Sequence, residues 1–232
     1  KRCYQKQGIS SRMTNAAKIR EALNKAKVYK AKIEAAGDDA SKLPAYDQKS
    51  EALIPVLNHE IPLKAHAHQA NDILTAIRIA KEFHVKLTLE HTTEGNLIVD
   101  ELVKAGYPCA VGPSLGHATK FELQNKTWTT PGVLAKAGCQ VSIITDAPVT
   151  PQKYLSLCAA MAVRAGMESY EALKAITINP AKHLGIEDRV GSLAVGKDAD
   201  ILIFSGDPLD GISLPDQVLI DGKLIENTSG QL

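Results

Sequence analysis

The sequence has few aromatic residues and no long hydrophobic run. Aromatic side chains make up 4% of its 232 residues, and no apolar segment approaches the ~20 residues that a transmembrane helix requires. The first five residues, KRCYQ, contain no apolar stretch typical of a secretion signal. The lack of a long apolar run disfavours a membrane protein, and we expect a cytoplasmic protein with no membrane partner.

Cysteines are also scarce and widely spaced. The four cysteines include no CxxC pair, which is the spacing that many zinc sites and redox sites use. Reduced thiols in an intracellular protein are therefore a simpler interpretation than a disulfide framework. The hydrophobic share of 44% and the charged share of 23% are ordinary for a globular protein that is long enough to bury a core.

The net charge is only +1, but the charges are unevenly distributed. Residues 1–34 contain ten Lys and Arg against two Glu, whereas residues 187–232 contain nine acidic residues against three basic ones. A basic segment can bind nucleic acid. Here the basic residues lie on the polar face of an amphipathic helix predicted over residues 14–36, and few aromatics are present to stack on bases. We expect a solvated helix face and no nucleic-acid partner, with nucleic-acid binding as an alternative.

From residue 51 onward, predicted strands and helices alternate. The hydrophobic pattern predicts strands over residues 61–66, 85–91, 107–111 and 139–145, and helices over residues 71–83, before Gly106, from Thr130 to Gly138 and from Thr150 to Gly166. This alternation with short loops indicates a parallel sheet with helices packed outside it. After residue 185 the pattern changes, and three short strands around an Asp221-Gly222 turn predict a small antiparallel β unit.

Four strand–helix units fit either an open doubly wound sheet or part of a (β/α)8 barrel. An open sheet that binds a nucleotide has a glycine-rich turn after its first strand, and this sequence has none there. Instead, His66, His91 and Asp146 stand at the ends of predicted strands. That edge is where barrel enzymes place their active sites. The polar residues therefore favour a TIM-type barrel.

Several segments resemble the imidazolonepropionase-like amidohydrolases. Residues 64–69 (KAHAHQ) resemble the fifth-strand segment of that family, residues 89–91 (LEH) the sixth-strand segment, and Thr145-Asp146 the eighth. The tail over residues 179–200, with NPA, GSL and GKDAD, resembles the segment that leads such barrels into a small β-sandwich. The resemblance covers about residues 51–226, and the tail is its most specific part.

The resemblance implies a divalent metal, usually zinc, and an activated water that hydrolyses an amide or other C–N bond in a small molecule. It makes His66 the fifth-strand metal ligand, and His91 a second-metal ligand or a group that polarises the substrate carbonyl. It makes Asp146 the eighth-strand ligand and the catalytic proton acceptor. His68 stands where relatives often carry Asp, so it is the second choice as a ligand. Imidazole and carboxylate groups suit zinc.

One part of the family's metal site has no counterpart in the sequence. The family's first ligands form an HxH pair on the first strand, yet residues 1–60 contain a single histidine. With the resemblance, this predicts the second half of a (β/α)8 barrel over residues 1–186 and a small β-sandwich segment over residues 187–232. Because a half-barrel leaves open sheet edges, we expect a homo-oligomer or pairing with a chain that carries the missing half. We also expect the chain alone to bind zinc weakly or not at all.

The remaining polar residues show less specific patterns. His117 follows the third strand on the active edge and is a candidate substrate-binding residue, while Glu94 and Lys120 near it are left open. The other histidines are expected in a loop, at a helix end and on a helix surface: His59, His84 and His183. The alternative to a hydrolase is a non-catalytic fragment or interaction module that keeps half of the fold.

Overall fold

The computed structural model describes residues 11–226, which form two compact units. Among these residues, the first unit contains residues 11–65 and 71–88, and the second contains residues 66–70 and 89–226. None of the helices in this described part is long and apolar enough to cross a membrane. The predicted boundary between residues 186 and 187 remains a prediction.

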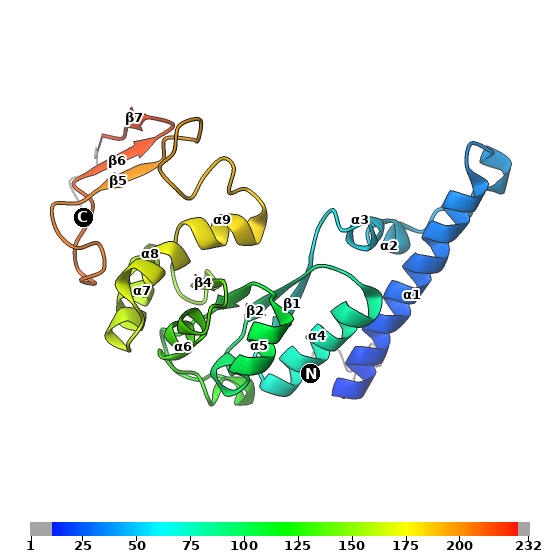
Figure 1. The fold of residues 1–232 in the computed structure, drawn as a ribbon, viewed down its shortest axis with the longest axis horizontal. Helices are drawn as coiled ribbons and strands as arrows, with labels where there is room; N and C mark the ends of the chain where they lie inside the picture. Colours follow the sequence, from blue (N-terminus) through cyan, green and yellow to red (C-terminus); the bar gives the residue numbers. More distant parts are fainter. Residues whose placement is uncertain (1–10, 227–232) are drawn as a thin grey trace. The chain divides into compact units, whose positions relative to one another are not determined.

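The first unit is built around a long helix, α1 (Arg12–Ala36). The helix begins two residues before the predicted start, because the Ser11 side chain accepts a hydrogen bond from the Thr14 amide and caps it. Arg12 pairs with Asp72 at 2.8 Å, and Arg20 pairs with Glu82 at 2.7 Å. Both acids lie on α4 (Ala70–Phe83), which runs alongside α1 in Figure 1. Part of the basic face is therefore occupied by ion pairs.

Short elements complete the first unit. They are η2 (Ala40–Lys42), α2 (Gln48–Glu51) and α3 (Ile54–Leu57). Buried side chains of α1 include Leu23, Ala26 and Tyr29, which belong to the apolar stripe of the sequence. Ile19, which helical spacing places on the same apolar face as these residues, is 40% exposed. The buried face of α1 is therefore narrower than its apolar face.

A four-stranded parallel sheet confirms the predicted α/β class. Its strands, in spatial order, are β1 (Leu63–Ala67), β2 (Leu87–His91), β3 (Cys109–Val111) and β4 (Val141–Ile143). β2 pairs in parallel with β3, and β3 with β4. The Leu63 amide donates to the Lys86 carbonyl, and the Thr92 amide donates to the Ala67 carbonyl. β1 and β2 therefore also run parallel.

The helices of the second unit alternate with the strands as predicted up to residue 164, and two further helices follow without a strand between them. The helices are α5 (Val99–Ala105), α6 (Thr130–Lys136), α7 (Leu155–Arg164), α8 (Ser169–Ala175) and α9 (Ile178–Leu184), with single turns η3 (Gly95–Leu97), η4 (Phe121–Leu123) and η5 (Gln152–Tyr154). Ile143 of β4 packs with Cys158, Ala159 and Ala162 of α7 in one buried cluster. Small side chains there let the helix approach the strand closely.

Strand register places Glu90 and Ser142 in one row of the sheet. Ala110 of β3 lies between them, and alternation directs this row to the face opposite that of Leu89. His183 of α9 meets Glu90 there, with its Nε2 2.9 Å from Oε1. His183 is only 7% exposed, so the expectation of a helix-surface histidine is wrong.

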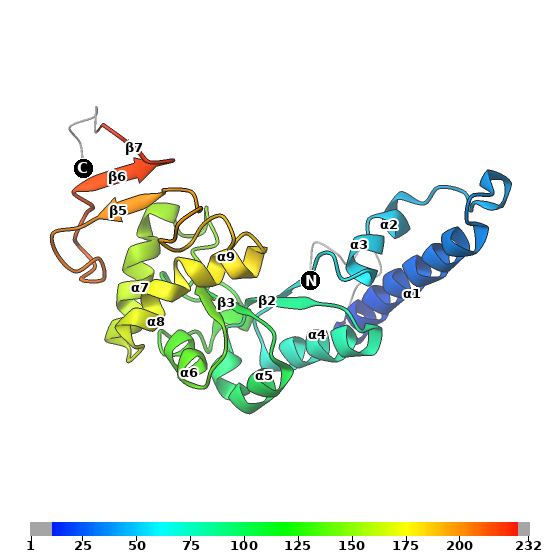
Figure 2. The same cartoon turned by 45° about the horizontal axis from the view of Figure 1, so that its top comes forward.

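The chain after α9 forms the predicted antiparallel β unit. Its strands are β5 (Ile201–Ile203), β6 (Gln217–Ile220) and β7 (Lys223–Leu224), which Figure 2 draws in orange and red. The turn between β6 and β7 is Asp221-Gly222, with φ values of 50° and 73°. Left-handed backbone at both turn residues is what a two-residue hairpin requires.

Candidate metal centre

Three histidines gather at the carboxyl ends of β1 and β2. His66 lies in β1, His68 follows it, and His91 is the last residue of β2. One ligand nitrogen from each histidine lies within 4.8 Å of the other two. Ring centroids are 4.2 Å apart for His66 and His91, and 4.4 Å apart for His68 and His91. This is the density of imidazole groups that a divalent metal requires.

Left-handed backbone directs His91 into this cluster. The Thr92–Ala67 hydrogen bond places His91 beside Ala67, whose side chain lies on the opposite face from that of His66. His91 has a φ of 75° and Thr92 a φ of 42°, a conformation that non-glycine residues rarely adopt. The reversal brings the His91 Nε2 atom within 3.0 Å of the His66 Nδ1 atom.

A backbone carbonyl determines which nitrogen of His91 is available. The Gly112 oxygen lies 2.7 Å from the His91 Nδ1 atom. Because a carbonyl can only accept, Nδ1 carries the proton and Nε2 keeps its lone pair directed at the cluster. This hydrogen bond is the kind of outer contact that orients metal-binding histidines.

The surroundings keep the other two rings neutral. Burial lowers the pKa of His68 to about 3, and the nearby charges of His91, His66 and Lys120 act in the same direction. Burial likewise lowers the pKa of His66, again with His91 and Lys120, while Asp146 opposes the shift. His68 Nδ1 lies 2.8 Å from the Thr93 hydroxyl. Neutral imidazole is the form that binds metals, so the rings of His66 and His68 need no deprotonation near neutral pH.

Asp146 lies near the histidines but outside the three-residue group. Among residues 11–226, the group within 4.8 Å consists of His66, His68 and His91. Asp146 follows β4 with a φ of 52° and is exposed, and its charge is close enough to raise the His66 pKa. The structure therefore brings the second-choice ligand, His68, into the group. A ligand role for Asp146 remains a prediction.

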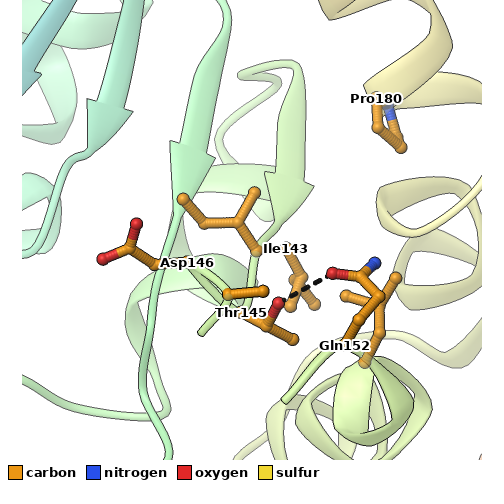
Figure 3. A pocket seen from close by; sticks show the side chains of 8 residues that line it. Ile143, Thr145, Asp146, Gln152 and Pro180 are labelled. Atoms are coloured by element: carbon orange, nitrogen blue, oxygen red, sulfur yellow. Dashed lines mark hydrogen bonds between the residues drawn. The ribbon is translucent and has the colours of Figure 1, made fainter. Parts of the chain in front are cut away.

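A cavity of about 330 Å³ lies beside Asp146. In Figure 3 the Asp146 carboxylate points away from Thr145 and Gln152. The Thr145 hydroxyl donates to the Gln152 Oε1 atom at 3.0 Å. The remaining lining is mostly apolar and comes from the end of β4, the loop after it, α7 and α9: Ile143, Ile144, Ala147, Leu155 and Pro180.

The loop between β3 and α6 carries the remaining candidates. His117 is exposed, and its carbonyl and that of Gly116 accept hydrogen bonds from the Lys126 ammonium group. Lys120 is exposed, and its charge reaches His66 and His68. Whether His117 contacts substrate remains a prediction. His59 and His84, with φ values of 62° and 55°, lie in turns after α3 and α4.

Sequence reasoning missed Thr93 and left the role of Glu94 open. Thr93 and Gly112 contact the rings of His68 and His91, and Glu94 is only 7% exposed. The run of Thr92, Thr93 and Glu94 directly after His91 was the available signal. A polar run after a buried strand often supplies contacts for a site.

Comparisons with known proteins identify the family. The family model described as "Amidohydrolase family" matches residues 10–225. The crystal structure of an amidohydrolase from Thermotoga maritima MSB8 superposes with a TM-score of 0.90 and 41% identity, over 97% of this chain and 59% of that chain.

Curated relatives agree with this match. "Amidohydrolase tasK" of Hapsidospora irregularis is 29% identical over 180 residues, which are 76% of this chain and 18% of that protein. The imidazolonepropionase of Streptococcus pyogenes serotype M1 is 29% identical over 153 residues, which are 64% of this chain and 35% of that protein. The chain thus spans about a third or less of the length of these curated relatives. The chain belongs to the amidohydrolase family.

Proposed function

We propose that this chain is part of a metal-dependent hydrolase that cleaves an amide or other C–N bond in a small molecule. The observation that carries the proposal is the group of three histidines whose ligand nitrogens lie within 4.8 Å of one another. Family membership supports hydrolysis as the reaction class. The likeness to imidazolonepropionase favours a cyclic amide, an amidine or a peptide-like substrate.

In this proposal His66, His68 and His91 hold the metal, with zinc as the preferred ion. Three imidazoles and an open position are the donor set of many catalytic zinc sites. When bound, the metal supplies Lewis-acid activation of water and of the substrate carbonyl. The hydrogen bond that His91 donates to the Gly112 carbonyl and the contact between His68 and the Thr93 hydroxyl orient two of the rings before any ion arrives.

The other polar groups at this edge have separate roles in the proposal. Asp146 accepts a proton from the attacking water, because it is an exposed carboxylate whose charge acts on His66. His117 and the cavity beside Asp146 contact the substrate. In the alternative role, in which His91 polarises the substrate carbonyl, it does not bind the metal, because its Nδ1 atom already donates to the Gly112 carbonyl.

We further propose that the parallel sheet is the second half of a (β/α)8 barrel and that β5, β6 and β7 belong to a small β-sandwich. β1 and β4 are the outer strands of the sheet in the described part of the chain. In the antiparallel unit, Leu202 is 57% exposed and Leu224 is 58% exposed. Open edges and exposed apolar strands favour a second copy or a partner chain with complementary strands.

The test is metal uptake by the purified chain and by single variants. His66→Ala, His68→Ala and His91→Ala are each expected to weaken Zn²⁺ binding by at least ~100-fold, since each removes one direct ligand. His84→Ala, an exposed histidine after α4, is the matched control and should bind like the wild type. Measurable Zn²⁺ binding of equal strength in all five proteins would refute the site.

A hydrolysis assay separates the enzyme from the alternative, a non-catalytic fragment or interaction module. A panel of cyclic amides, N-acyl amino acids and dipeptides is incubated with the Zn²⁺-loaded chain and with a longer protein that carries the family's HxH strand. Turnover that is lost in Asp146→Asn supports the proposed roles. Metal binding by the chain with no turnover in either protein would favour the non-catalytic alternative.

A further inference from the structure

The segment after β2 holds the chain that follows β1. The Thr92 amide donates to the Ala67 carbonyl at 3.1 Å, and the Glu94 amide donates to the His68 carbonyl at 2.9 Å. The Thr93 hydroxyl lies 2.8 Å from the His68 Nδ1 atom. Three successive residues therefore contact the backbone or ring of the His68 segment, and its position depends on theirs.

The Glu94 carboxylate joins this segment to a second one. Its Oε2 atom accepts a hydrogen bond from the Ala70 amide at 2.8 Å, and its Oε1 atom accepts one from the Asn125 side-chain amide at 2.8 Å. Glu94 is only 7% exposed. Removing a carboxylate from water costs free energy that neutral donors offset only in part. A residue retained at such a cost is a candidate for a role beyond packing.

Asn125 belongs to the loop that reaches the histidines. This loop, residues 112–129, connects β3 to α6 and is held together where Lys126 donates to the carbonyls of Gly116 and His117. It also carries Lys120, whose charge acts on both His66 and His68. The Glu94–Asn125 hydrogen bond thus fastens a loop beside the cluster to the same carboxylate that fixes the chain after His68.

We propose that Glu94 is a positioning residue that sets His68 and the loop of residues 112–129 relative to each other, one through each carboxylate oxygen. The inference rests on the proposed function, because it assigns Glu94 to the support of that metal site. Glu94 itself does not contact the metal or the substrate. Its effect passes through Ala70 on one side and Asn125 on the other.

The experiment compares Glu94→Gln, Asn125→Ala and a control, Glu101→Gln, in the full chain. The glutamine keeps the shape of Glu94 but turns one acceptor into a donor, so it loses one of the two contacts. Glu101 is an exposed acid in the first turn of α5. The readouts are Co²⁺ affinity from visible absorption and the rate of trypsin cleavage after Lys120.

Glu94→Gln is expected to weaken Co²⁺ binding by about 10- to 100-fold, the usual effect of removing support from a metal ligand, and to speed cleavage after Lys120. Asn125→Ala should speed the same cleavage while leaving the Co²⁺ affinity closer to that of the wild type. Glu101→Gln should change neither. If Glu94→Gln only lowers the melting temperature, with wild-type Co²⁺ affinity and cleavage, Glu94 is purely structural and the inference is overturned.

Failure of the proposed function would be recognised separately. In that case the wild-type chain would take up no Co²⁺. Histidine-selective nitrogen NMR of the metal-free chain then decides the inference. If Glu94 positions the His68 ring, Glu94→Gln shifts the ring nitrogen signals of His68. Unchanged His68 signals together with unchanged cleavage would overturn it.

Discussion

Replacing Gly112 by alanine should destabilise the protein and disturb His91. A Cβ atom at Gly112 would lie 2.1 Å from the Ile144 carbonyl oxygen, and the residue has a φ of 141°. Contacts below 3.0 Å force the backbone to shift, and the backbone of Gly112 supplies the carbonyl that binds His91 Nδ1. The substitution therefore affects the fold and the candidate site together.

The size of the effect follows from two contributions. A non-glycine residue in a rarely populated backbone region costs about 1–3 kcal/mol, and an unsatisfied buried donor on His91 costs about 1–3 kcal/mol. A combined loss of about 3 kcal/mol corresponds to a fall in melting temperature of roughly 6–12 °C for a chain of this size. Zn²⁺ affinity should fall as well, because the His91 ring loses its orienting contact.

Thermal unfolding followed by circular dichroism measures the effect, with Gly116→Ala as the control. Gly116 lies in the same loop at a φ of 90°, but nothing stands within 4 Å of an added Cβ atom. It should show the backbone strain alone, about 1–3 kcal/mol, without the contact with Ile144 or the loss of the His91 hydrogen bond. Equal melting temperatures for the two variants would refute the reasoning, because the close approach to Ile144 would then have no energetic consequence.

Three further predictions concern pH, the core and assembly. The pKa of His68 falls from 6.5 to about 3 on folding, so between these pH values the unfolded chain binds more protons than the folded chain. The free energy of unfolding should therefore decrease as the pH falls from 6.5 toward 3. In chemical denaturation at several pH values, His68→Gln should show a weaker pH dependence over this range. Leu134→Ala, at a fully buried position, should lower the free energy of unfolding by about 2–5 kcal/mol, whereas Leu97→Ala, at a position 60% exposed, should have little effect in the same urea titration. Light scattering should find a dimer or larger assembly, since outer strands such as β5 expose the apolar side chains of Leu202 and Ile203. A soluble monomer that unfolds in one cooperative thermal transition would contradict the proposed pairing.

Local patterns in the sequence were sufficient for the elements and for the family. Side-chain periodicity predicted all four parallel strands, because alternation and turn residues are properties of neighbouring positions. The same holds for the Asp221-Gly222 hairpin, whose turn type needs the left-handed conformations that these two residues tolerate. The motifs around His66 and His91 indicated the amidohydrolase family, which the comparisons confirm.

The sequence predicted that His66 and His91 lie at one edge of the sheet, but only the tertiary structure decided how they meet and which other polar groups contact each other. Alternation along the strands puts the side chains of His91 and Ala67 on the face opposite that of His66, and the positive φ of His91 reverses that direction. The contact of His183 with Glu90 spans 93 positions, and the bond from Asn125 to Glu94 spans 31. Periodicity carries no information about such pairs, because they arise when separate elements pack. The sequence by itself therefore determined the strands and the family, and packing determined the three-histidine group and the residues that hold it.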